Sequence, residues 1–217
     1  MTTPSRPPHS AHSTDSPHSA DPPSPSSSPP PPPRSYASPS TGAPRRHVLA
    51  PVSGPQPGAD VGLLVLRLAV GLTMAAHGSQ KLFGWFDGNG LDATAAFFAS
   101  DGYKAAKAMA WVAALTETLC GLGLAIGLLT PLAGAGILGI MLNAMAVKWG
   151  GGFFSPEGVE YDIVLLAGAV SVALAGPGRI AVDELLPVLR DHRFSRGVAA
   201  VVLGAVSAAF VLVVLRD

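Results

Sequence analysis

The sequence predicts an all-α integral membrane protein: a bundle of four transmembrane helices and a fifth, C-terminal transmembrane helix, preceded by a disordered N-terminal tail. Three observations predict this class. Of the 217 residues, 48% are hydrophobic and only 13% are charged, whereas soluble domains carry about 25% charged residues. Proline and serine are concentrated before residue 60, and long apolar runs fill most of the chain after it.

The charged and reactive residues exclude several classes of function. Basic and acidic residues balance at 14 each, so nothing in the charge favours nucleic acid as a partner. Cys120 is the single cysteine, which excludes an internal disulfide, a paired-cysteine redox site and a cysteine-based metal site. The first apolar run begins at Val61, too far along for a secretory signal, so we expect the first transmembrane helix to direct insertion.

The N-terminal segment, residues 1–59, holds 17 of the 21 prolines and 13 serines. Such a composition cannot bury enough apolar surface to offset the entropy of ordering the chain, so we expect a disordered cytoplasmic tail. Its role stays open between a dispensable extension and a docking segment for other proteins.

Five apolar stretches after the tail approach the length of about 20 residues that an α-helix needs to cross a bilayer. Pro131 separates the second from the third, because proline cannot continue one helix but can open the next. The fourth reaches 17 residues only when it is extended at both ends. The stretches are residues 61–80, 105–129, 131–147, 160–176 and 197–215. We therefore divide the membrane region into a four-helix unit, residues 60–187, and a connector with the fifth helix, residues 188–217.

Flanking charges predict the orientation of the helices, since cytoplasmic segments carry an excess of lysine and arginine. Arginines precede the first span and fill the connection between the fourth and the fifth: Arg45, Arg46, Arg179, Arg190, Arg193 and Arg196. Residues 84–104 and 149–160, on the other side, hold five acids and one lysine. We therefore expect a multi-pass protein of the plasma membrane with a cytoplasmic N-terminus and an outside C-terminus. Residues 182–189 are expected to form a short amphipathic helix on the cytoplasmic side.

Polar and ionisable side chains inside the apolar stretches are the candidates for a buried site, because they are costly in a bilayer and are expected to face inward in pairs. At 1.5 Å of rise per residue, Arg67 lies about 10 Å from the cytoplasmic side, and Glu117 and Asn143 about 18 Å. A long arginine side chain covers much of this difference. The depths predict a buried ion pair between Arg67 and Glu117, with Asn143 as a further partner. Such a group either fixes helix register or forms a pocket for a ligand or a proton relay.

A second candidate region lies near the outer end of the first stretch, where His77, Gln80 and Lys81 follow one another within one helical turn. Aromatic residues at 83–86 and 149–154 are expected at the same membrane surface as interfacial anchors. They leave open a shallow cleft for a lipid-soluble ring compound. Metal binding is not expected, since no second histidine occurs in the membrane region.

Several motifs occur in a fixed order along the chain. The first is Leu66-Arg67-Leu68 followed by HGSQKLFGWF at residues 77–86. The later ones are Glu117 with the segment 121–131, Gly152-Phe153-Phe154, Glu160-Tyr161 and Gly176-Pro177-Gly178. Over residues 60–187 these motifs resemble the DoxX family of membrane proteins. Many members of that family carry a histidine near the outer end of the third helix, where this chain has Lys148-Trp149.

The resemblance implies a four-helix membrane fold and an association with redox systems, including quinol oxidation and responses to thiol stress. It also marks a set of positions: Arg67, His77, Gln80, Lys81, Glu117, Glu160 and Tyr161. Among these, His77, Gln80, Lys81, Glu160 and Tyr161 form a candidate outer-face site. No cofactor is evident in the chain itself, and a diffusible quinone is the cofactor that the resemblance suggests. The expected partners are the lipid bilayer and redox proteins; no oligomeric state is predicted.

We therefore expect an accessory or quinone-interacting subunit of a redox-linked membrane complex. If the chain takes part in an enzyme, it does so as an oxidoreductase subunit acting with quinone or a partner protein. Two alternatives from other classes stay open. One is a non-catalytic scaffold that recruits soluble partners to the membrane, and the other is a small-molecule permease.

Overall fold

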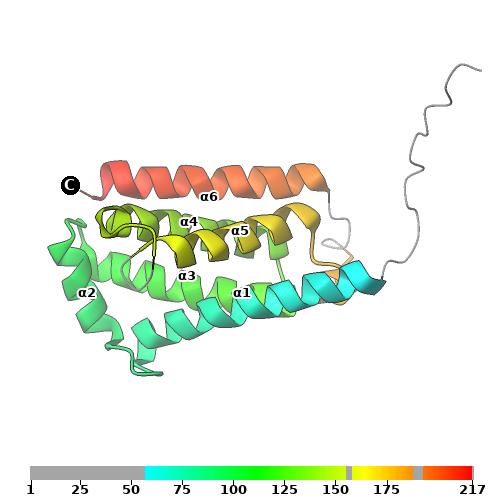
Figure 1. Cartoon of the computed structure of the whole chain (residues 1–217), viewed down its shortest axis with the longest axis horizontal. Coiled ribbons are helices and arrows are strands. Elements are labelled where there is room, and N and C mark those ends of the chain that lie inside the picture. Colours follow the sequence, from blue (N-terminus) through cyan, green and yellow to red (C-terminus); the bar gives the residue numbers. More distant parts are fainter. Residues whose placement is uncertain (1–56, 155–157, 188–192, 217) are drawn as a thin grey trace, which may run out of the picture. The chain divides into compact units, whose positions relative to one another are not determined.

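The computed structural model describes residues 57–154, 158–187 and 193–216, and these ranges are helical apart from their connections (Figure 1). The elements are α1 Pro57–Phe83, α2 Gly90–Ser100, α3 Ala106–Ile126, α4 Thr130–Lys148, the 3-10 helix η1 Trp149–Gly151, α5 Glu160–Ala175, the 3-10 helix η2 Val182–Leu185, and α6 Phe194–Val214. The predicted all-α fold is confirmed. The predicted disordered tail lies outside the described residues except at residues 57–59, which open α1.

Each of the five predicted spans corresponds to one helix: α1, α3, α4, α5 and α6. Among the described residues, α1, α3, α4 with η1, and α6 are long and apolar enough to cross a membrane. The predicted fourth span, α5, has only 16 residues, about 24 Å of helix. It is therefore shorter than the hydrocarbon core of a typical bilayer, about 30 Å.

Helix α2 was not predicted, because residues 84–104 were interpreted as a loop between two spans. The segment Gly90–Ser100 is rich in alanine and forms a helix of 11 residues. Backbone conformations that are rare outside glycine mark the connections on both sides, at Phe86 and Asp87 before the helix and at Ala105 after it. The helix is too short to span a bilayer and packs on α3.

The helices form two groups that lie side by side (Figure 1). Helices α1 and α3 are antiparallel and in close contact. A Cβ atom added at Gly71 would lie 2.5 Å from the carbonyl oxygen of Gly121, and one added at Gly121 would lie 2.5 Å from the nitrogen of Ala75. Helix α4 packs on α3 and carries α5 and α6 on its other side. Glycine at these positions allows the close backbone approach that holds helices together in lipid.

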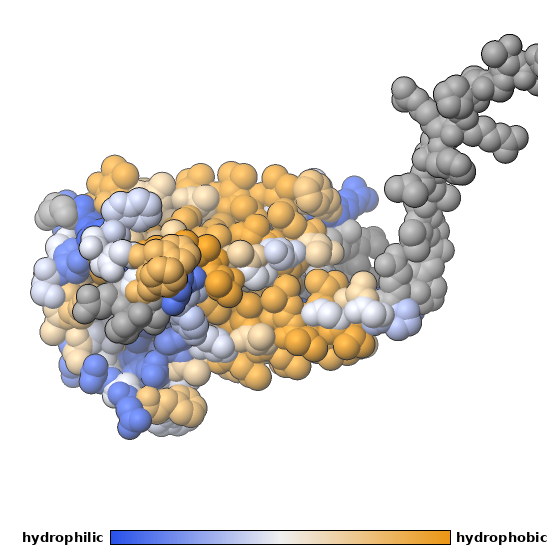
Figure 2. Space-filling view, viewed as in Figure 1, coloured by the Kyte–Doolittle hydropathy of each residue, from blue (hydrophilic) through white to orange (hydrophobic). Residues whose placement is uncertain are grey.

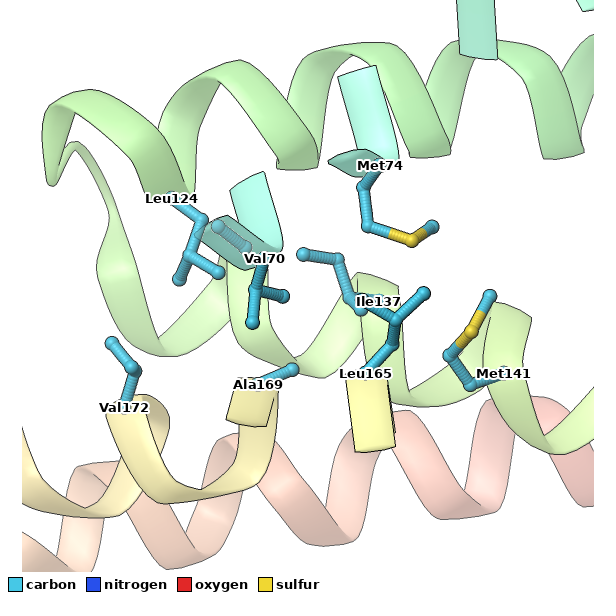
Figure 3. Packing of buried hydrophobic residues seen from close by; sticks show 9 residues of the cluster. Val70, Met74, Leu124, Ile137, Met141, Leu165, Ala169 and Val172 are labelled. Carbon is cyan, nitrogen blue, oxygen red and sulfur yellow. The ribbon is translucent and has the colours of Figure 1, made fainter. Parts of the chain in front are cut away.

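The hydrophobic core lies where the two groups meet (Figure 3). Met74 and Leu124 are fully buried on α1 and α3, and they face Ile137 of α4 and Val172 of α5, which are also fully buried. Between the two groups, contact between side chains contributes through dispersion, since lipid tails are as apolar as the core itself. The outer surface in Figure 2 is apolar along the helices, and hydrophilic residues gather at the end where α2 lies.

The end of the bundle opposite α2, here called the Asp183 end, is closed by the segment after α5. The carboxylate of Asp183 accepts hydrogen bonds from the backbone nitrogens of Leu129, at 2.7 Å, and Thr130, at 2.9 Å, and so caps the start of α4. The backbone nitrogen of Asp183 donates to Gly127 at 2.8 Å. The predicted amphipathic helix at 182–189 is reduced to η2, because its residues make these contacts; residues 188 and 189 lie outside the described ranges.

The α2 end, by contrast, is tied together by the last described residues of the chain. Tyr103 and Arg216 form an isolated antiparallel bridge. The backbone nitrogen of Lys104 donates to Leu215 at 2.8 Å, and the guanidinium of Arg216 lies 3.1 Å from the Asp101 carboxylate. These contacts fix the C-terminal end of α6 against the connection between α2 and α3.

Candidate functional site

A cavity of about 830 Å³ lies between the two groups of helices and reaches the α2 end. Its wall is contributed by α1 to α6, and most of its lining residues are apolar. The ionisable ones include two ion pairs and a histidine–tyrosine contact, which are described in turn, and also Tyr103 and Asp87. Concave, mostly apolar sites with a few convergent polar groups are typical of ligand-binding sites.

The first ion pair joins α1 to α3. The Nζ atom of Lys81 lies 2.6 Å from Oε2 of Glu117, whose side chain is only 4% exposed. Gly78, one turn before Lys81, allows this approach, because a Cβ atom there would lie 2.5 Å from the backbone nitrogen of Thr118. Since the carboxylate is removed from water, its charge depends on the lysine for compensation.

The second ion pair joins α4 to α5. The Nζ atom of Lys148 donates to both carboxylate oxygens of Asp162, at 3.1 and 3.0 Å. The side chain of Asp162 is 4% exposed and that of Lys148 is 37% exposed. The two groups of helices thus each present one buried carboxylate with one lysine to the same cavity.

His77 links α1 to α5 inside this arrangement. Its Nδ1 atom lies 3.0 Å from Oε1 of Gln80, and its Nε2 atom lies 3.1 Å from the hydroxyl of Tyr161. Gln80 uses its amide nitrogen to donate to the carbonyl of Phe86 at 3.1 Å, so its oxygen is the acceptor for the histidine. In the neutral ring the proton then lies on Nδ1, and Nε2 accepts from Tyr161.

Tyr103 and Asn143 complete the polar lining on the side of α2 and α4. The hydroxyl of Tyr103 donates to Oδ1 of Asn143 at 3.4 Å, and Nδ2 of Asn143 donates to its own helix at Gly139. Burial raises the pKa of Tyr103 above its ordinary value, with Asp101 adding to the rise and Arg216 opposing it. The phenol therefore stays protonated at neutral pH and can act as a donor.

The predicted ion pair between Arg67 and Glu117 is wrong. Arg67 is completely buried, but it donates to the carbonyl of Ile180 at the Asp183 end. The depth estimate failed because the arginine side chain extends away from Glu117. The close packing of Gly71 on Gly121 instead places Glu117 opposite Gly78 and Lys81.

The other predicted site residues divide between the cavity and its surroundings. His77, Gln80, Lys81, Glu117, Asn143 and Tyr161 line the cavity together. Glu160 is half-buried at the first turn of α5 and is not a lining residue, and Arg67 lies outside the cavity as well.

Sequence reasoning missed Asp162, Lys148 and Tyr103. Asp162 lies inside the fourth predicted span, so the rule that drew attention to Glu117 could have found it as well. Lys148 was noted only as a departure from the pattern of similar proteins. Tyr103 carried no signal, because only the fold of α2 and the C-terminal contacts bring it into the wall.

These features define a multi-pass helical membrane protein with a largely apolar cavity whose wall carries two buried ion pairs. Residues 62–149 match the family model DoxX, so this segment of the chain is similar to the DoxX family. The matched segment runs from α1 through α4, so it contains Lys81, Glu117 and Lys148, whereas Tyr161 and Asp162 lie beyond it.

Two curated relatives are similar over somewhat more than half of this chain. "Putative oxidoreductase CatD" of Bacillus subtilis is 29% identical over 128 residues, which cover 58% of this chain and 88% of the relative. "Uncharacterized membrane protein Rv3486" of Mycobacterium tuberculosis is 28% identical over 143 residues, which cover 57% of this chain and 80% of the relative. No solved structure matches the chain.

Proposed function

We propose that this DoxX-like protein binds a quinone in the cavity and serves as an accessory subunit of a redox-linked membrane complex. The observation that carries the proposal is the pairing of two buried carboxylates, Glu117 and Asp162, with two lysines on the wall of one apolar cavity. The name of the relative from Bacillus subtilis, which includes the word oxidoreductase, supports the same class of function.

The chemistry of a quinone matches the groups that line the cavity. Its ring is flat and apolar, and its two carbonyl oxygens accept hydrogen bonds. Lys81 and Lys148 present ammonium donors from two sides of the cavity. Reduction to the quinol adds two electrons and two protons. The two lysines supply one proton to each oxygen, and the buried carboxylates hold the lysines in place.

The electrons would come from a reduced group on a partner oxidoreductase. The chain has one cysteine, Cys120, so it cannot form a dithiol–disulfide couple of its own. This chain would therefore bind and protonate the quinone while another protein reduces it. That division of roles is why we propose an accessory subunit and not a self-sufficient enzyme.

The distribution of polar groups supports binding over the two alternatives. A permease needs polar groups along a path between both membrane faces, but the ionisable lining residues reach no further towards the Asp183 end than Glu117, near the middle of α3. A scaffold that only recruits soluble partners does not require buried charged side chains on the wall of a cavity. Following the arginine distribution, we place the protein in the plasma membrane with the α2 end outside and the N-terminus in the cytoplasm.

The test is the amount of quinone that purifies with the protein from its native membrane. We expect close to one isoprenoid quinone per polypeptide in the wild type, and a loss to the bulk-membrane ratio in Glu117→Gln and Asp162→Asn. Asp92→Asn is the matched control, because Asp92 pairs with Lys107 at a side chain that is 91% exposed and outside the cavity. Each variant is checked for a single folded species by size-exclusion chromatography. Quinone at the bulk ratio in all four proteins would reject the proposal and favour the scaffold.

A further inference from the structure

The cavity continues from its polar half into an apolar groove that runs along α4. The lining residues of α4 extend from Leu132 to Lys148, which corresponds to about 24 Å of helix. The two ion pairs and His77 lie among the lining residues of α1, α3, α4 and α5, whereas the lining residues of α6, between Leu203 and Val211, include no ionisable group. The cavity is therefore polar in the half towards α1 and α5 and apolar in the half towards α6.

The apolar half is open on one side, between α3 and α6. Val112 of α3, Leu132 of α4 and Leu203 of α6 all line the cavity, yet they are 51%, 51% and 53% exposed. Helix α6 packs on α4 and α5 and not closely on α3. The groove thus has α4 as its floor and α3 and α6 as its two walls, and its opening lies among the apolar residues that face lipid in a membrane.

We infer that this groove holds the hydrocarbon tail of a lipid-soluble quinone, which enters sideways from the bilayer between α3 and α6. The inference rests on the proposed function and extends it, because it assigns the ligand to the class of tailed quinones. The ring lies between the two ion pairs, and the tail runs along α4 and leaves the groove between Val112 and Leu203. Burying the tail in this groove adds apolar contact along most of α4.

The charge of the polar half favours a neutral ring over a phospholipid headgroup. Lys81 is matched by Glu117, and Lys148 by Asp162, while Asp87 is a further acid in the lining. The lining therefore carries no excess positive charge for a phosphate. A neutral quinone needs hydrogen-bond donors without net charge, and this is what the two ion pairs offer.

Helix α6 is essential to this groove, although it lies outside the segment that matches the family model. Leu203 and Ser207 lie one turn apart on the wall of the groove, and Gly204 lets α6 approach α4, since a Cβ atom there would lie 2.5 Å from the carbonyl oxygen of Ala135. Helix α6 thus supplies the second wall of the tail groove.

The test fills the groove from α6 and compares two ligands with the same ring. Ser207→Phe places an aromatic ring in the groove, and Ser207→Leu fills it less. Val206→Phe is the control, because Val206 is the neighbouring residue on α6, is 60% exposed and does not line the cavity. The ligands are menaquinone with its isoprenoid tail and menadione, which lacks the tail. Equilibrium binding is measured on the purified full-length proteins in lipid nanodiscs, and thermal unfolding confirms that each variant is folded.

We expect Ser207→Phe to weaken menaquinone binding tenfold or more and Ser207→Leu to weaken it less. Menadione should bind the two Ser207 variants as tightly as it binds the wild type. The Val206→Phe protein should bind menaquinone and menadione as tightly as the wild type does. Unchanged menaquinone binding in folded Ser207→Phe overturns the tail groove, even if Glu117→Gln abolishes binding and so upholds the ring site. Equal weakening of both ligands also overturns it. A wild type that binds neither ligand overturns the proposed function, and the tail groove with it.

Discussion

Glu117 is a buried carboxylate whose charge is compensated by one lysine, Lys81, so replacing either residue is expected to be costly. Ion pairs removed from water gain little net stability, because the cost of desolvation offsets the attraction between the charges. Removing one partner alone, however, leaves an uncompensated charge and typically costs about 3–5 kcal/mol. Stability measurements can therefore identify the partner of Glu117. They distinguish Lys81, the partner in the structure, from Arg67, the partner predicted from helical depth.

The residue-scale prediction concerns coupling between these side chains. We expect Lys81→Met and Glu117→Gln to be non-additive, with a coupling energy of about 1–3 kcal/mol, because each substitution removes the partner of the other. Arg67→Met and Glu117→Gln should add to within about 0.5 kcal/mol, since Arg67 bonds at the Asp183 end. The measurement is the free energy of unfolding in detergent micelles for both double-mutant cycles. Strong coupling of Glu117 to Arg67, and none to Lys81, would contradict the register of α1 on α3.

At the scale of the elements, the contact between α1 and α3 sets this register. Both helices meet at glycines, and the backbone atoms of Gly121 and Ala125 occupy the space where a side chain at Gly71 would lie. Packing at this distance leaves no freedom to slide by one residue, so it determines which side chains of the two helices face each other. This contact between α1 and α3, more than the flexibility of the lysine side chain, brings Lys81 within reach of Glu117.

The element-scale prediction compares one substitution at two glycines of α1. A Cβ atom at Gly71 would lie 2.5 Å from the Gly121 oxygen and 2.6 Å from the Ala125 nitrogen, whereas one at Gly62 would meet nothing within 4 Å. We expect Gly71→Ala to lower the free energy of unfolding by about 1–3 kcal/mol through overpacking. Gly62→Ala should be neutral or stabilising by up to about 1 kcal/mol, because alanine is the better helix former. Thermal unfolding of both variants is the measurement, and equal stability of the two would argue against the close helix pair.

For the whole molecule, the orientation in the membrane can be tested with single cysteines. Cys120→Ser removes the only cysteine. In that background, Ser100→Cys marks the α2 end and Arg179→Cys marks the Asp183 end, and both positions are exposed. We expect a membrane-impermeant thiol reagent to label the Ser100→Cys protein in intact cells and the Arg179→Cys protein only after permeabilisation. The reverse pattern would invert the proposed topology and place the α2 end of the bundle on the cytoplasmic side.

The sequence was sufficient for the fold class and for the five predicted spans, but not for helix α2 or for the contacts that build the site. Apolar runs of the right length located α1, α3, α4, α5 and α6, because the bilayer imposes a length on each helix. The rule that buried ionisable groups are functional led to Glu117. Its partner could not be derived, because the α1–α3 register depends on glycine packing in three dimensions. Asp162 could have been found by the same rule, whereas Tyr103 enters the cavity only through the placement of α2, which no local pattern encodes.

The short length of α5 has a consequence for the lipid around the protein. With 16 residues, it spans about 6 Å less than a typical hydrocarbon core. Lipids next to α5 must thin or tilt to avoid exposing their tails to water, at a cost of fractions of a kcal/mol per Å of mismatch. The protein thus carries a fixed site of hydrophobic mismatch on one flank. Thinner bilayers relieve this mismatch, so the stability of the protein should depend on acyl-chain length in reconstituted membranes.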